Sequence, residues 1–196
     1  MWKRHAPAYF KRVGRARNFQ EAYFATVTDK QKMLLEDYTD GGESLWINNY
    51  LRGIHLQSLS KTDKTVLRRK ARTLNKLIRN APPSPHKMIL FRSIAQGAPR
   101  HQVYHRFSEA EFLSKGIIST SVSYKAALEF IEEGEDCCML VILVPGGTKM
   151  LQVLDASAWS EEKEVLLPHG QTFKIVKEAR IKGVKTYYCV LVRQKA

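Results

Sequence analysis

Two glutamates separated by one residue are the first feature of this sequence that could do chemistry. They lie in the segment 161–168, Glu-Glu-Lys-Glu-Val-Leu-Leu-Pro, where an apolar run follows the second of the pair. If residues 162–167 form a strand, Glu162 and Glu164 point to the same face, because side chains alternate along a strand. Paired carboxylates suit reactions through an oxocarbenium ion at a sugar, where one stabilises the cation and the other acts as acid or base. The pattern also fits a solvent-facing strand edge.

An arginine and a serine-rich stretch stand in two other segments that are typical of strands. Arg92 interrupts the apolar run 88–94, where a buried charge is costly unless it is paired. Its guanidinium could form a structural ion pair, or it could bind a phosphate or carboxylate through its planar fork. Ser119-Thr120-Ser121 follows Gly116-Ile117-Ile118. These hydroxyl residues could form a turn or orient a neighbouring carboxylate.

The elements that must position these residues begin with a helical half. The clearest helix carries Leu67, Ala71, Leu74 and Ile78, an apolar stripe at the i, i+4, i+7 and i+11 positions. Thr62 or Asp63 is its expected N-cap. A proline-rich stretch at 81–85 ends this half. The sequence predicts helices over residues 20–38, 43–52 and 62–79.

A strand-rich half follows, in which short runs rich in Val and Ile are bounded by Gly, Pro or polar clusters. Two short helices are expected within it, over 108–114 and 123–133. Helices followed by strands favour an α+β domain with mainly antiparallel sheets. The predicted strands are 87–94, 116–122, 138–144, 150–154, 163–167, 171–180 and 184–193.

Length and composition set the broad class. The 196 residues, 44% apolar and 26% charged, suit one domain with a sizeable core and exclude wholesale disorder and collagen-like structure. We expect a basic tail or helix over 1–20 and a single domain over 21–196, helical from about 21 to 80 and sheet-forming from about 86 to 194. No apolar run approaches the roughly 20 residues that span a bilayer. The start has no secretory signal, so a cytoplasmic site of action is expected.

Cysteine and histidine are not arranged for metal binding. Cys137, Cys138 and Cys189 make no Cys-x-x-Cys pair, so we expect reduced thiols buried in strands. His101 and His105 have the i, i+4 spacing of a zinc pair on a helix, but no third ligand stands nearby. The sequence therefore predicts no metal site.

The charge of the chain is uneven. The net charge is +13, and residues 1–100 hold 20 basic and 7 acidic residues, whereas residues 101–196 hold 12 of each. A field of this sign attracts nucleic acid, acidic proteins or anionic membranes. Beside the apolar stripe of the helix 62–79 runs a basic stripe, which is a candidate nucleic-acid contact. Its members are Arg68, Arg72, Lys76 and Arg79.

Arginine, Ser-Thr-Ser and Glu-x-Glu, in this order and each on a strand, resemble the arginine–serine–glutamate class of mono-ADP-ribosyltransferases, which includes the iota-toxin-like bacterial toxins. The segments around them carry the same resemblance. Residues 112–121 are similar to the serine strand of that class, 141–148 to the strand and turn that follow, and 162–175 to the catalytic strand. Residues 37–39 and 47–52 resemble its N-terminal helices, so the match spans roughly 35–193.

The resemblance implies a fold and a set of roles. The fold would place N-terminal helices before two packed, mainly antiparallel sheets that enclose an NAD cleft. Arg92 would bind the diphosphate and ribose of NAD, and Ser119 would hold the catalytic glutamate. Glu164 would hydrogen-bond the nicotinamide ribose and stabilise the cation as nicotinamide leaves. Glu162 would orient and deprotonate the nucleophile.

Further contacts are implied at the edges of the cleft. Trp159, in the loop 155–161, would meet the target together with Glu162. Phe130 falls where the family often has an aromatic residue against nicotinamide, although packing in the core beside Leu128 and Ile131 is an equal alternative. The remaining implied NAD contacts are Thr120, Ser121 and, on the adenosine side, Asn48.

The resemblance implies an NAD-dependent mono-ADP-ribosyltransferase that modifies a macromolecule and releases nicotinamide. NAD would be a co-substrate, and no metal is needed. Glu162, two residues before Glu164, is associated in the family with arginine as the acceptor, whereas the charge of +13 favours RNA or DNA. A non-catalytic nucleic-acid-binding module on a transferase scaffold is a further alternative. The class also implies a toxin, an injected effector or a phage modifier that acts as a monomer, away from membranes, with an antitoxin or immunity partner.

Overall fold

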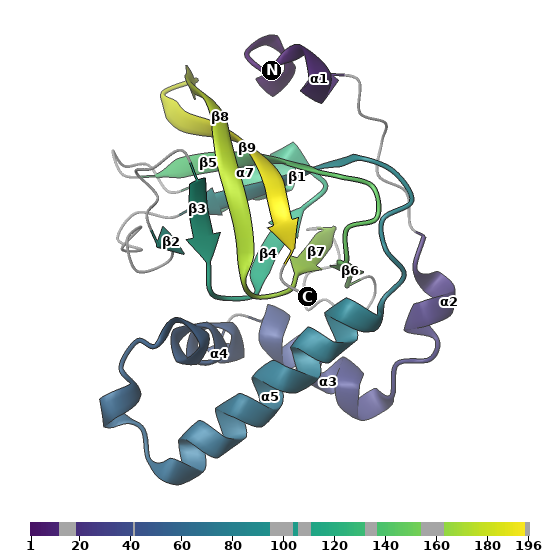
Figure 1. Cartoon of the computed structure of the whole chain (residues 1–196), viewed down its shortest axis with the longest axis vertical. Coiled ribbons are helices and arrows are strands. Elements are labelled where there is room, and N and C mark those ends of the chain that lie inside the picture. Colours follow the sequence, from purple (N-terminus) through teal and green to yellow (C-terminus); the bar gives the residue numbers. More distant parts are fainter. Residues whose placement is uncertain are drawn as a thin grey trace.

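The computed structural model describes residues 1–11, 19–40, 42–94, 104–105, 111–131, 137–153 and 163–194 (Figure 1). Helices gather in the first half of the chain and strands in the second, so the predicted α+β class is confirmed. Within the described residues, no helix has the length and apolar character that crossing a membrane requires. The helices are η1 (Trp2–Arg4), α1 (Ala8–Lys11), α2 (Glu21–Phe24), α3 (Asp29–Thr39), α4 (Gly42–Arg52), η2 (Leu56–Ser58), α5 (Lys61–Asn80) and α7 (Tyr124–Glu129).

The longest helix, α5, forms as its apolar stripe predicts. Its buried residues include Leu67, Leu74 and Ile78. The predicted N-cap is wrong, because the cap is Ser60, which lies before both of the residues that were expected. The Ser60 hydroxyl oxygen accepts a hydrogen bond from the Asp63 backbone N–H at 3.0 Å, and the Asp63 carboxylate accepts one from the Ser60 backbone N–H at 3.2 Å. Asp63 therefore completes a capping box from the third helical position.

The strands form one continuous sheet in the order β2-β3-β8-β9-β5-β1-β4-β7-β6. Every described pairing is antiparallel except β5 with β9. The mainly antiparallel character is therefore confirmed, and the strands that were expected in two packed sheets form one continuous sheet. Its strands are β1 (Met88–Ile94), β2 (Tyr104–His105), β3 (Glu111–Ser114), β4 (Ile118–Ser121), β5 (Cys138–Val144), β6 (Leu151–Gln152), β7 (Glu164–Leu167), β8 (Gln171–Ile181) and β9 (Val184–Gln194).

A helix was expected over 108–114, and this expectation is wrong for the residues that can be compared. Residues 106–110 lie outside the described part, but Glu111–Ser114 is the strand β3, paired with β8. Phe112 is buried there and stacks on Phe173, with ring centroids 5.2 Å apart. Pairing and ring packing between segments about sixty residues apart thus override a weak local helical pattern.

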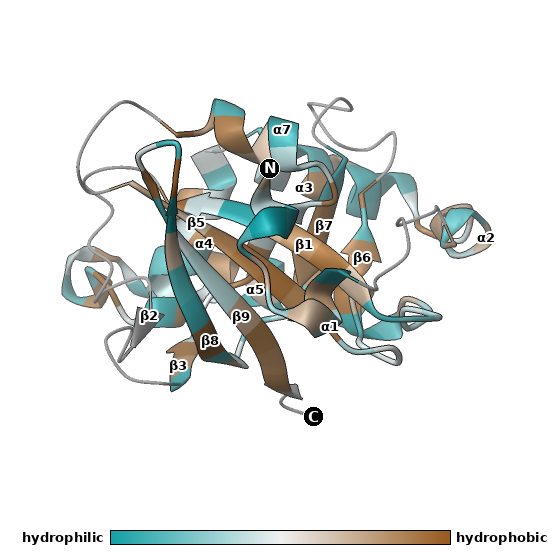
Figure 2. Ribbon diagram, turned by 90° about the horizontal axis from the view of Figure 1, so that it is seen from above, coloured by the Kyte–Doolittle hydropathy of each residue, from teal (hydrophilic) through white to brown (hydrophobic). Residues whose placement is uncertain are grey.

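Three apolar clusters hold the layers together. One is formed by side chains of the sheet strands and joins Phe112 and Phe173 to Ile118 and Leu167. A second packs α3, α4 and α5 under the strands β6 and β7 and under Ile117, just before β4, as Figure 1 shows. Figure 2 shows the apolar character of β1, β7 and β9 and the hydrophilic residues of the helices around them.

The third cluster packs the start of the chain on the far face of the sheet. The Trp2 ring meets Phe91 edge-on at 5.3 Å between centroids, and Phe10 meets Tyr188 at 5.6 Å. The Tyr188 hydroxyl donates a hydrogen bond to the Trp2 carbonyl at 2.6 Å. The first eleven residues are thereby fixed to the last strand, β9.

All three cysteines are free and buried, as predicted. Cys138 lies on β5, Cys189 lies on β9, and Cys137 directly precedes β5. Burial raises the pKa of the Cys189 thiol. These thiols therefore pack as small apolar groups in the core.

Candidate active site

Three neighbouring strands bring together the arginine, the serine and the glutamate that the sequence singled out. Arg92 lies on β1, Ser119 on β4, and Glu164 is the first residue of β7. Because β4 lies between β1 and β7 in the sheet, residues more than seventy positions apart in the chain meet in one place. The candidate site lies at this meeting point.

The register of β4 with β7 places both serines beside the glutamate. Ser121 is the direct partner of Glu164, and Ser119 is the partner of Leu166. Directly opposed residues share a face of the sheet, as do residues two apart on one strand. Ser119, Ser121 and Glu164 therefore lie on one face, with the Glu164 side chain buried at 6% exposure.

The half-buried Arg92 side chain crosses from β1 to β4. One of its terminal nitrogens, Nη1, donates a hydrogen bond to the Ser119 carbonyl oxygen. Its Nε atom is buried and makes no hydrogen bond with any described residue. A guanidinium held at one end, with a further donor inside the site, is suited to binding an anionic group.

The chain enters β7 through an uncommon backbone conformation. Lys163 has a φ of 50°, in the left-handed region that side chains other than glycine rarely adopt. Its carbonyl accepts a hydrogen bond from the Val122 N–H at 3.3 Å, and the Glu164 carbonyl accepts one from the Val153 N–H at 3.1 Å. The backbone on both sides of the Lys163–Glu164 bond is therefore fixed by neighbouring segments.

A buried tyrosine and an asparagine close the site from the helical side. The Asn48 side-chain oxygen accepts from the Ile117 N–H at 2.9 Å, and its amide nitrogen donates to the Tyr38 hydroxyl at 2.9 Å. Burial raises the pKa of Tyr38 to about 12, and the charges of Arg92 and Glu164 both act on this phenol. Tyr38 is thus an uncharged phenol that lies close enough to Arg92 and Glu164 to interact with their charges.

Arg52, at the end of α4, approaches the same place. A Cβ atom added at Gly116 would lie 2.7 Å from the Asn48 Oδ1 atom and 3.3 Å from the Arg52 Nε atom. The absence of a side chain at Gly116 therefore lets α4 pack against the segment that leads into β4. The sequence reasoning missed Tyr38 and Arg52 as site residues. The i, i+4 spacing of Asn48 and Arg52 on one helix face was the signal that could have identified Arg52.

Thr120, Ser121 and Asn48, which are implied NAD contacts, each form a hydrogen bond within the protein. Thr120 is buried and donates from its hydroxyl to the Val165 carbonyl at 2.6 Å, so it joins β4 to β7. The Ser121 hydroxyl oxygen accepts from the Ser123 N–H at 2.9 Å, just before α7. Asn48 uses both ends of its amide within the protein. In this structure Thr120 and Asn48 position backbone segments.

Phe130 stands at the end of α7 and is 51% exposed. The alternative that it packs in the core is therefore wrong. Leu128 and Ile131, its expected core neighbours, do pack against the apolar cluster on this face. An exposed aromatic ring at this position remains available to a ligand.

The rest of the predicted site is only partly described. Glu162 and Trp159 lie outside the described residues. Across the described ranges no group of three or more histidine, cysteine or acidic side chains could hold a metal ion. The basic stripe of α5 lines a separate cavity of about 420 Å³, with Tyr50 of α4 and His169 on its walls.

Comparisons with known proteins agree with this geometry. The family model described as ADP-ribosyltransferase exoenzyme matches residues 10–193. No curated protein matches the chain. The fold is similar to that of the C3 exoenzyme of Clostridium limosum, with a TM-score of 0.65 and 19% identity over 89% of this chain and 92% of that one.

Two further solved structures show the same fold. C3stau2 from S. aureus, solved with NAD, gives a TM-score of 0.66 and 19% identity over 92% of this chain and all of the other (100%). The ADP-ribosyltransferase Vis, solved in complex with agmatine, gives a TM-score of 0.63 and 18% identity over 86% of this chain and 77% of that one.

Proposed function

The chain belongs to the ADP-ribosyltransferase exoenzyme family, and from that premise we propose that it is a mono-ADP-ribosyltransferase that takes ADP-ribose from NAD. We assign the reaction centre to Arg92, Ser119, Glu162 and Glu164. The observation that carries the proposal is the arrangement on β1, β4 and β7, where Glu164 is buried opposite Ser121 and the Arg92 guanidinium reaches the Ser119 carbonyl.

NAD fits the chemistry of these side chains. The diphosphate of NAD is an anion, and Arg92 offers a charged donor that is buried and makes no hydrogen bond with the described residues at Nε. Arg52, next to Gly116, supplies a second cation at the helical edge of the site. The exposed ring of Phe130 offers an apolar surface for the nicotinamide. C3stau2, which shares the fold, was solved with NAD.

The proposed reaction exchanges one bond for another at C1′ of the nicotinamide ribose. The bond from C1′ to the nicotinamide nitrogen breaks, and its electron pair leaves with neutral nicotinamide. The Glu164 carboxylate stabilises the positive charge that develops on the ribose. Its burial strengthens this effect, because electrostatic interactions are larger away from bulk water. The acceptor then bonds to C1′ and loses one proton to Glu162.

Protein arginine is the proposed acceptor. A guanidinium is protonated at neutral pH and is a poor nucleophile, so a base beside it is required, and Glu162 precedes Glu164 by two residues. Vis, which has the same fold, was solved in complex with agmatine, a small guanidinium compound. Both points support a guanidinium acceptor for this chain.

Nucleic acid is the second candidate acceptor. The specific observation that favours it is α5, which carries eight basic residues and a single acidic one, Asp63. A toxin or effector, with a neutralising partner and a cytoplasmic site of action, is the setting in which we place either activity.

The proposal is tested with NAD labelled on the adenylate, the purified protein and a cell lysate that is divided after the reaction. One portion is treated with protease and the other with RNase and DNase. Label lost to protease, and released by hydroxylamine, supports arginine transfer. Label lost only to nucleases supports nucleic acid as the acceptor. Absence of label in both, with NAD intact, overturns the enzymatic proposal, and Glu164→Gln is the matched inactive control.

A further inference from the structure

The basic stripe of α5 forms one wall of a cavity rather than an open helix face. Tyr50 and Leu51 of α4 and His169, which follows β7, form the other walls. We name this cavity, of about 420 Å³, the basic groove. We propose that the basic groove binds a single-stranded nucleic acid, with the phosphates on its cations and a base within the cavity.

The first argument is uncompensated charge. Arg68, Arg72 and Lys76 are exposed and follow one another every four residues, about 6 Å apart along the axis. No acidic side chain in the described ranges forms an ion pair with any of the three. Lys70, on the same helix, does have such a partner, because it meets Glu43 at 2.7 Å. The groove therefore concentrates positive charge that the rest of the described protein does not neutralise.

Like charges at i, i+4 spacing destabilise a helix. The only acid of α5, Asp63, is engaged in the capping box at the start of the helix. The helix is instead held by its buried apolar stripe against α3 and α4. A polyanion laid along Arg68, Arg72 and Lys76 would remove this repulsion and release its own counterions.

The second argument is the shape and chemistry of the interior. The volume lies within the range of pockets that hold small ligands, which suits a nucleotide unit better than a flat membrane surface. Tyr50 offers a ring on which a base can stack. The Asn75 side-chain oxygen is buried and accepts no hydrogen bond from the described residues. Phosphodiesters have no proton to donate at neutral pH, whereas the amino and imino groups of bases do.

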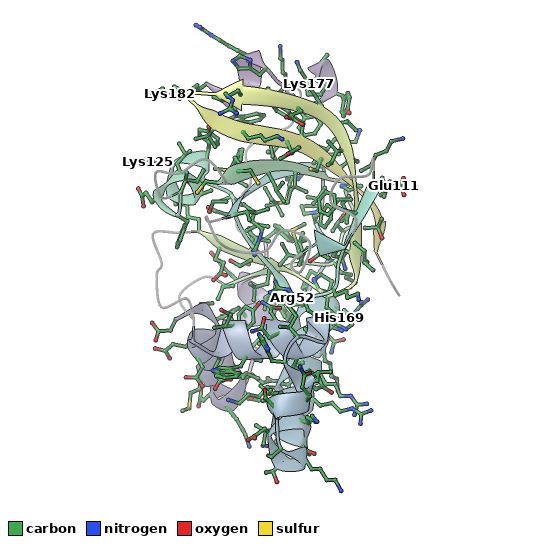
Figure 3. The ribbon with its side chains drawn as sticks, turned by 90° about the vertical axis from the view of Figure 1, so that its left-hand side faces the viewer. Arg52, Glu111, Lys125, His169, Lys177 and Lys182 are labelled. Atoms are coloured by element: carbon green, nitrogen blue, oxygen red, sulfur yellow. The ribbon has the colours of Figure 1, made fainter. Side chains whose placement is uncertain are left out.

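The third argument is position. Tyr50 and Leu51 lie between Asn48 and Arg52 on α4, and those two residues contact the segment that leads into β4. His169 lies two residues beyond the end of β7, whose first residue is Glu164, and the five residue steps from Glu164 to His169 extend at most about 17 Å. Figure 3 shows Arg52 and His169 where the helical part meets the sheet. A strand bound in the groove would thus run close to the candidate active site.

This inference concerns binding and does not require NAD chemistry, so it can fail independently of the proposed function. The direct test measures fluorescence anisotropy of a labelled 12-nucleotide single-stranded RNA over a series of salt concentrations. The groove variant is Arg68→Glu, Arg72→Glu, Lys76→Glu. The matched control reverses the same number of charges on the same helix, outside the groove, as Lys61→Glu, Lys64→Glu, Arg69→Glu.

We expect the groove variant to lose at least about tenfold in affinity, and its plot of log K against log salt to flatten by roughly 2 for three lost phosphate contacts. The control should keep most of the affinity and slope. Equal losses of RNA affinity in both variants would overturn the assignment to the groove, because they would show that RNA responds only to the overall positive charge of the helix. An unchanged melting temperature in the groove variant would show that it remains folded.

Tyr50→Ala keeps the proposal testable if the triple variant does not fold. Loss of stacking should weaken RNA binding roughly fivefold to a hundredfold while the salt slope stays unchanged. Equal binding by wild type and Tyr50→Ala would contradict a base in the cavity. Displacement of the RNA by vesicles of phosphatidylserine and phosphatidylcholine, but not by unlabelled oligonucleotide, would overturn the proposal in favour of a membrane.

Discussion

Ser121 on β4 lies directly opposite Glu164 on β7, whereas Ser119 lies opposite Leu166. The serine that the family resemblance assigns to the glutamate is therefore its diagonal neighbour, and a second hydroxyl stands closer in register. Diagonal neighbours on one face of a sheet are still within reach of each other. Both serines can accordingly act on the orientation of one buried carboxylate.

Replacement of each serine should separate their effects. We expect Ser119→Ala to lower kcat for nicotinamide release by about tenfold to a hundredfold, because the carboxylate loses an orienting group in the transition state. Thermal stability should change little. Ser121→Ala should also lower the melting temperature, because its hydroxyl accepts from the Ser123 N–H before α7. Equal melting temperatures for the two variants would contradict this difference.

The two glutamates should separate cleavage from transfer. Glu164→Gln should reduce both nicotinamide release and transfer by about a hundredfold to a thousandfold, because an amide does not stabilise the developing cation. Glu162→Gln should retain nicotinamide release and lose transfer, because only the nucleophile depends on the base. Parallel assays of nicotinamide and of labelled acceptor check this. If Glu162→Gln lost both activities to the same extent, the assignment of Glu162 as the base for the nucleophile would be wrong.

Tyr38 predicts a specific response to alkaline pH. Its pKa rises from 10.0 in the unfolded chain to about 12 in the folded protein, first because of burial. The neutral phenol therefore contributes stability that is fully present below pH 10 and is lost as the pH rises through about 12. Tyr38→Phe should flatten the fall in unfolding free energy between these values, measured by urea titration at each pH. Tyr9→Phe, at an exposed tyrosine, is the matched control.

Gly116 is expected to tolerate no side chain. The Cβ of alanine would lie 2.7 Å from the Asn48 Oδ1 atom, which is held by the Ile117 N–H. Overpacking of this kind costs about 1–3 kcal/mol. Gly116→Ala should therefore lower the free energy of unfolding by this amount and raise the KM for NAD. Gly42→Ala, where nothing lies within 4 Å of the added atom, is the matched control.

Lys163 should be a position next to Glu164 where glycine is favourable. Its φ of 50° is strained for a side chain and free for glycine. We expect Lys163→Gly to keep or slightly raise stability, and Lys163→Val to lower it by about 1–3 kcal/mol together with activity. Chemical denaturation of the two variants measures these changes in the free energy of unfolding. If Lys163→Val were more stable than Lys163→Gly, the left-handed backbone conformation of Lys163 would be contradicted.

Local patterns predicted the elements whose sequence signal is strong and unambiguous. The apolar stripe of α5 and the uninterrupted apolar run of β5 led to nearly correct bounds, because each pattern has a single physical solution. The helix expected near 111–114 failed, since pairing of β3 with β8 is a contact between distant segments. The Ser60 cap was missed because two later residues that also favour capping offered an equivalent pattern.

Part of the candidate site was predictable because it also stands out in the local sequence pattern. Arg92, Ser119 and Glu164 stood out because polar groups in apolar strands need an explanation, and the sheet brings them to adjacent strands. Tyr38 and Arg52 lie on helices with ordinary patterns, and only tertiary packing gives them their place. Glu162 and Trp159, outside the described residues, stay predictions.

The place of the last strand in the sheet has a consequence for the time at which the protein can become active in the cell that makes it. β9 lies between β8 and β5 in the sheet order, and its Tyr188 also anchors Trp2 from the start of the chain. A nascent chain without β9 consists of two sheet fragments with open edges, and its N-terminal residues lack the ring on which Phe10 packs. The residues that would handle NAD lie on β1, β4 and β7, which all precede β9 in the chain, so they are synthesised before the strand that joins the two sheet fragments. The fold that carries the candidate site is therefore incomplete until β9 has emerged from the ribosome.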